Sequence, residues 1–90
     1  MTRMTIETTT RIWQEGKHYI AHALPLDVAS AGDSPEAARK ALQEAVELFV
    51  ATARSQGTLE DVLDECGYTF DGTNWVAPQI VAEQRDLMAV

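Results

Sequence analysis

Hydrophobic and polar residues alternate along the first quarter of the chain, which is the pattern of half-buried β-strands. Residues 4–14 are rich in Thr and Ile, which favours an extended strand, and residues 18–24 resume the alternation after the break at residues 15–17. A glycine in that short break predicts a β-hairpin. Pro25 ends the second strand because it has no N–H to donate, and residues 26–30 are predicted to form a short third strand.

The alternation divides the side chains of the hairpin between two faces. Any two-residue turn places Ile12, Tyr19, Ala21 and Ala23 on one face. The other face then holds Trp13, Ile20, His22 and Leu24. Because both faces are partly apolar, we expect one to meet a helix of the same chain and the other to meet a second element or another chain.

A helical period begins after the third predicted strand. Ser34 suits the N-cap, Pro35 the first helical position, and Glu36 the positive end of the helix dipole. Apolar residues then recur at spacings of three and four and form one stripe, namely Ala38, Leu42, Val46, Phe49 and Ala53. Gly57 fits the left-handed position that ends a helix. The pattern therefore predicts an amphipathic helix from Pro35 to Gln56.

The last third of the chain has shorter elements. Thr58 opens a short second helix with a box-like cap, in which Asp61 stands where Glu or Gln is usual. Residues 68–76 contain an Asp-Gly turn and predict a small hairpin. Residues 79–83 and 87–90 are predicted to be extended segments that close the chain.

These elements predict one α+β domain over residues 1–90, with strands and helices in the order β-β-β-α-(α)-β. Three strands and a C-terminal one would form an antiparallel sheet. Ninety residues with 46% hydrophobic content are enough for one small core. Because a chain this short has two apolar sheet faces and one long helix, we also expect a homodimer or a higher homo-oligomer.

Charge and targeting signals narrow the class of protein. The chain has 14 acidic and 7 basic residues, a net charge of −7, which repels phosphate backbones. Such a charge fits either an ordinary soluble acidic protein or a protein with a basic partner. Residues 1–10 lack the apolar core of a signal peptide, and no apolar run is long enough to span a membrane. We expect a cytoplasmic protein without membrane contact.

Candidate catalytic and metal-binding residues are few. His18 and His22 lie four residues apart, but on a strand that spacing covers about 13 Å, too far for one ion held by both. Cys66 is the one cysteine, so no internal disulfide forms, and its place on the apolar edge of a short helix favours buried packing over nucleophilic attack. A small metal-dependent nuclease would need several converging carboxylates, and the predicted strands offer Glu7. We expect no catalytic residue, no cofactor and no metal, with the nuclease as the alternative of a different class.

Partner-binding residues are the remaining candidates. Trp13 and Trp75 are proposed as anchors because aromatic residues dominate interfaces, although Trp75 fits a role in capping the core equally well. Three acidic side chains on the second helix, Asp61, Asp64 and Glu65, fit a solvated face or a mimic of a polyanion.

Residues 12–50, IWQEGKHYIAHALPLDVASAGDSPEAARKALQEAVELFV, resemble the HicB family of antitoxins. The parts follow that family's order: a strand, a tight turn, a second strand with Tyr19 and Ala21, a short third strand and a long helix. The most specific element is the start of that helix, Gly32-Asp33-Ser34-Pro35-Glu36 with Ala38. The resemblance implies a partial ribonuclease H-like fold and the neutralisation of a HicA-like mRNA interferase toxin, a small protein with a fold like that of double-stranded-RNA-binding domains.

The chain differs from the family in two places. Leu26-Asp27-Val28 replaces the family's usual Pro-Gly turn after the second strand. Residues 57–90 contain no recognisable ribbon-helix-helix or helix-turn-helix module and little basic charge, so we do not expect DNA binding. A stand-alone HicB-like regulatory or protein-binding domain without a toxin partner is therefore the alternative within this family.

Overall fold

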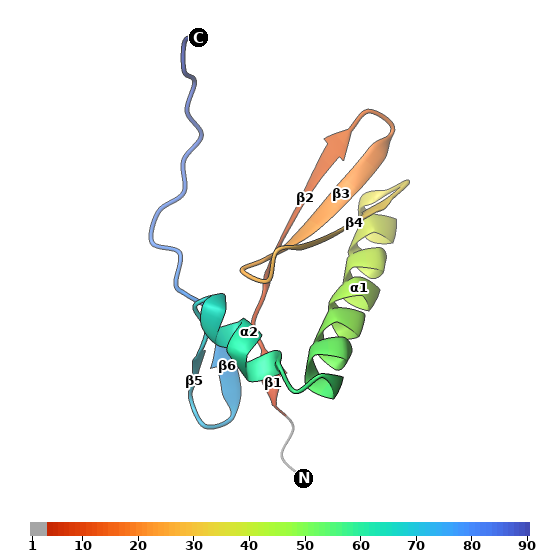
Figure 1. The fold of residues 1–90 in the computed structure, drawn as a ribbon. Helices are drawn as coiled ribbons and strands as arrows, with labels where there is room; N and C mark the ends of the chain where they lie inside the picture. The colour runs from red at the N-terminus through yellow and green to blue at the C-terminus, as the bar shows by residue number, and fades with distance from the viewer. Residues whose placement is uncertain (1–3) are drawn as a thin grey trace.

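The computed structural model describes residues 4–90, so residues 1–3 of the expected domain lie outside the described residues (Figure 1). The described residues have the predicted α+β class. The main sheet is antiparallel, in the order β2 (Thr9–Glu15), β3 (His18–Leu24), β4 (Val28–Gly32). A small sheet has the order β1 (Thr5–Ile6), β6 (Asn74–Val76), β5 (Thr69–Phe70). The long helix α1 (Pro35–Ser55) lies along the main sheet, and the short helix α2 (Leu59–Glu65) lies beside the small sheet.

The register of the main sheet confirms the predicted division of the hairpin faces. Ile12 pairs with Ala21, and Trp13 pairs with Ile20. The turn between the strands contains Gly16 at a φ of 60°, a left-handed conformation that glycine adopts without strain. The face with Ala21 is the one that α1 covers, so the side chain of Trp13 lies on the opposite face.

The third strand begins at Val28, two residues later than predicted. Leu26 and Asp27 belong to the turn, in which the Asp27 N–H donates to the Ala23 carbonyl oxygen at 2.8 Å. At the other end of this strand, a Cβ on Gly32 would lie 2.5 Å from a backbone nitrogen of α1. Glycine at this position therefore lets β4 pass directly beneath the start of the helix.

The long helix begins at Pro35, as predicted, and ends one residue earlier than predicted. The Ser34 side chain accepts a hydrogen bond from the Ala37 N–H at 3.1 Å, which satisfies one of the unpaired N–H groups of the first turn. Ser55 is the last helical residue, Gln56 is the C-cap, and Gly57 has a φ of 73°. The predicted apolar stripe faces the sheet, because its members are buried or packed against the core.

Two clusters of buried side chains make up the core. The first lies between the N-terminal half of α1 and the main sheet and consists of Ala21, Ala23, Ala38 and Leu42. The second lies between the C-terminal half of α1, α2 and the small sheet, and consists of Leu26, Ala53, Leu59, Leu63, Tyr68 and Trp75. Small residues let the helix approach the main sheet closely, whereas larger side chains fill the space around α2.

The start of α2 differs from the sequence prediction. The Thr58 side chain makes no capping hydrogen bond, so the predicted capping box is wrong. Its hydroxyl instead donates to the Ala53 carbonyl oxygen at 3.3 Å, at the end of α1. The same carbonyl oxygen also accepts the Thr58 N–H at 2.9 Å, so Thr58 is held against the end of α1 and its side chain does not cap α2.

The sheets also differ from the prediction in their membership. The extended residues 4–14 are divided between β1 and β2 at Glu7 and Thr8, and β1 pairs in parallel with β6. The predicted C-terminal strand therefore does not join the main sheet. Residues 77–90 pair with no strand of the described chain. At their start, the Glu7 carboxylate accepts the Ala77 N–H, and Pro78 has no N–H to donate.

Candidate protein-interaction surface

Helix α1 covers one face of the main sheet and leaves side chains of the other face partly or fully exposed. We call this opposite surface the bare face. Its members come from all three strands and are Thr9, Arg11, Trp13, Glu15, His18, Ile20, His22, Leu24, Ala29 and Ala31. Half of these side chains are apolar, with Trp13, Ile20 and Leu24 the largest, so the bare face is the second, partly apolar surface that the alternating pattern predicted.

Trp13 is the largest exposed side chain of the bare face, with 41% of its surface accessible. Its indole N–H donates to the Glu15 carboxylate at 2.9 Å. The ring meets the His22 ring edge to face, with the centroids 6.1 Å apart. His22 Nε2 in turn lies 2.6 Å from an Asp27 carboxylate oxygen. An aromatic face held in place beside two carboxylates suits a cationic side chain of a partner.

Trp75, the second sequence candidate, has a different environment. It is 9% exposed, and its ring lies 5.0 Å from that of Phe70, at an interplanar angle of 37°. It belongs to the second core cluster. The structure therefore places the two tryptophans on different sheets, with Trp13 accessible and Trp75 largely covered.

The other titratable candidates are separate from one another. His18 Nδ1 lies 3.8 Å from an exposed Asp33 oxygen, and Cys66 is a half-buried free thiol at the end of α2. Glu7 accepts the Ala77 N–H at 3.0 Å. Within residues 4–90, no three His, Cys, Asp or Glu side chains are grouped so that they could hold a metal ion.

Negative charge gathers at the α2 end of the molecule. The exposed acidic side chains there are Glu60, Asp61, Asp64, Glu65 and Asp71, and α2 itself contains no basic residue. The N–H groups of Asn74 and Thr73 donate to the Asp71 carboxylate at 2.7 and 2.9 Å, which lowers its pKa. The bare face carries both signs of charge, so the negative field of the protein comes mainly from elsewhere.

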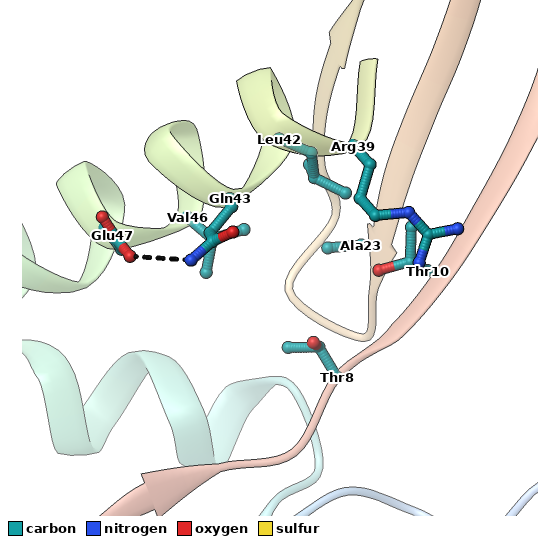
Figure 2. Close-up of a pocket in the computed structure, with 8 residues that line it drawn as sticks. All are labelled: Thr8, Thr10, Ala23, Arg39, Leu42, Gln43, Val46 and Glu47. Atoms are coloured by element: carbon teal, nitrogen blue, oxygen red, sulfur yellow. Dashed lines mark hydrogen bonds between the residues drawn. The ribbon is translucent and has the colours of Figure 1, made fainter. Parts of the chain in front are cut away.

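A groove of about 260 Å³ opens between α1 and β2 (Figure 2). Its apolar floor consists of Ala23, Leu42 and Val46. Its polar side chains are Thr8, Thr10, Arg39, Gln43 and Glu47. The sequence analysis missed this groove, although Thr10 at an inward-facing strand position was a signal that α1 leaves part of β2 uncovered.

Comparison with known protein families, curated proteins and solved structures gives no match. The relation to HicB antitoxins is therefore a resemblance of the sequence motifs in residues 12–50. Neither helix in the described part of the chain combines the length and the apolar character needed to cross a membrane.

Proposed function

We propose that the chain is a HicB-like antitoxin, one domain that binds and neutralises a small, basic, RNA-cleaving toxin of the HicA type in the cytoplasm. The motifs of residues 12–50 motivate the choice of partner. The observation that carries the proposal is the exposed ring of Trp13 on the bare face of an acidic protein.

Neutralisation would follow from coverage of the toxin's RNA-binding surface. A surface that binds RNA is cationic, so a net charge of −7 accelerates the encounter between the two proteins. Apolar contacts on the bare face would supply most of the affinity, with Trp13 as the central anchor. An Arg or Lys of the toxin would stack on the indole, near the carboxylates of Glu15 and Asp27. RNA cannot reach the toxin while that surface is occupied.

The test begins with the neighbouring reading frames: any small basic protein that one of them encodes is co-expressed with this chain. We expect the toxin to arrest growth alone, and this protein to restore growth and to co-purify with it. Trp13→Ala should weaken binding by at least about tenfold, as for an interface anchor. Leu48→Ala is the matched control, because Leu48 is 69% exposed on α1, away from the bare face.

Two results would contradict the proposal. Growth arrest that persists with both proteins present, without co-purification, would end the antitoxin interpretation. Magnesium-dependent cleavage of RNA by the purified protein alone would replace it with the nuclease alternative.

A further inference from the structure

The outer edge of β2 is a site at which another strand can be added. β2 pairs with β3 on one side, and within residues 4–90 no strand pairs with its other side. Such an edge presents unpaired N–H and C=O groups to any extended chain. The groove of Figure 2 lies on one side of this edge, and Trp13 lies on the other. An added strand would therefore direct its alternate side chains to apolar surface on both faces of the sheet.

Residues 79–90 have the composition of such a strand. They form an extended trace that lies apart from β2 (Figure 1), with an ion pair between Arg11 and Glu83 linking the two. Their large apolar side chains are 53–116% exposed and are Ile80, Val81, Leu87, Met88 and Val90. In a strand, Val81 and Leu87 would point to one face and the other three to the opposite face. Both faces of the segment are thus partly apolar, as the edge requires.

The segment does not close onto β2 of its own chain. The parallel ladder between β1 and β6 ends where the Glu7 N–H donates to the Trp75 carbonyl oxygen. Beyond it, the Glu7 carboxylate occupies the Ala77 N–H, and Pro78 has no N–H. Pro78 also packs against Gly67, where an added Cβ would lie 3.0 Å from the proline ring. A cavity of about 680 Å³ lies between residues 83–85 and residues 11–13 of β2.

We propose that the outer edge of β2 binds residues 79–90 of a second copy, and that two copies exchange these segments about a two-fold axis. A second copy suits this edge because the free edge and the exposed segment belong to the same chain. When two copies exchange segments, the β2 edge and the apolar segment of each copy are covered by the other copy. The inference shares Trp13 with the toxin surface proposed above, but it is argued from the β2 edge and the exposed segment and is tested on the protein alone.

Charge and area are consistent with this arrangement. The segment contains Glu83, Arg85 and Asp86, and β2 contains Arg11 and Glu15, so neither surface carries much of the net charge of −7. At roughly 100 Å² of apolar surface for each exposed aliphatic side chain, the segment offers roughly 500 Å² per copy. Trp13 and the paired backbone would bring this area toward the roughly 800 Å² per partner of a stable interface.

The test compares three full-length proteins by light scattering at tens of micromolar, a range in which moderate interfaces form. We expect the parent to have the mass of two copies. The double variant Val81→Ser, Leu87→Ser should dissociate at least about tenfold more readily. The control Leu48→Ser removes an exposed leucine from α1 and should remain dimeric. Hydrogen exchange should show the outward-pointing amides of β2 protected in the parent and unprotected in the double variant.

Each other result overturns the proposal. A monomeric parent with protected β2 amides would mean that the segment closes onto its own chain. A monomeric parent without that protection would mean that the edge stays free. A dimer that the double variant leaves unchanged would place the interface elsewhere.

Discussion

The core beneath the N-terminal half of α1 is built from small side chains, whereas the core beneath its C-terminal half is built from large ones. The first joins three alanines to Leu42. The second includes Leu63, Tyr68 and Trp75 and draws on residues from both ends of the chain. In the first core, stability depends on how closely helix and sheet approach. In the second, it depends on filled volume and on single hydrogen bonds between distant segments.

The largest expected effect is the introduction of a charge into either core. Leu42 and Leu63 are both buried, one in each cluster. Leu42→Asp or Leu63→Asp should lower the free energy of unfolding by several kcal/mol, because an unpaired carboxylate would lose its hydration. Phe49→Asp should cost less, since Phe49 is only half-buried. Chemical denaturation followed by circular dichroism measures each value. If Leu42→Asp melted like the parent, the stripe on α1 would not be the core.

Adding a single methyl group tests whether the first core depends on the close approach of helix and sheet. Gly32→Ala would add a methyl group 2.5 Å from the backbone nitrogen of Ala38. Backbone cannot move aside as a flexible side chain does, so we expect a loss of about 1–3 kcal/mol in denaturant unfolding.

Gly16→Asn is the matched control for this substitution. A Cβ at Gly16 has no neighbour within 4 Å, and Asn tolerates the left-handed φ of that turn. Its cost should be below that of Gly32→Ala. Equal costs would mean that the close approach of β4 and α1 does not limit the first core.

The smallest expected effect concerns pH and the second core. Burial raises the pKa of Tyr68 to about 12, and Cys66 and Glu7 add to the shift. The phenol also donates a hydrogen bond to the Glu7 carbonyl oxygen. The unfolded chain releases this proton near pH 10, so the folded state holds it more tightly. The resulting stability is complete below about pH 10 and is lost as the pH rises through about 12.

Urea unfolding at about pH 9 and about pH 11 tests this dependence. The midpoint of the parent should fall at the higher pH, and the midpoint of Tyr68→Phe should fall less. A variant with the same pH dependence as the parent would show that other groups cause the loss. At the lower pH, the variant should be less stable by about 1 kcal/mol, the usual worth of one hydrogen bond.

The parts that the sequence predicted depend on local signals. Gly16 sets the hairpin register, and Ser34 with the apolar stripe sets α1, so both follow from residues close together in the chain. The division of residues 4–14 between two sheets has no such signal. A run of threonines is equally extended in one strand or in two, and the partner of Thr5 is Asn74, far along the sequence.

The candidate interaction surface was also only partly predictable from the sequence. Trp13 and Trp75 both lie in short extended segments, and the sequence does not tell which of them is covered. Trp13 stays exposed because α1 packs on the opposite face of the sheet, the face that holds Ala21. Trp75 is covered because it packs against side chains of α2 in the second core cluster. Alternation thus identified the residues that share a face, while the assembled fold determined which face stays open.

The junction at Glu7 and Thr8 has a consequence for the order in which the protein folds. The main sheet and α1 are formed by residues 9–55. They can fold early, because the loops that must close between them are short and cost little entropy. β1 instead waits for β6, because Thr5 and Asn74 are 69 residues apart in sequence. On a ribosome, the main sheet and its helix can therefore assemble while the first strand is still unpaired. The small sheet closes last, after β6 has emerged.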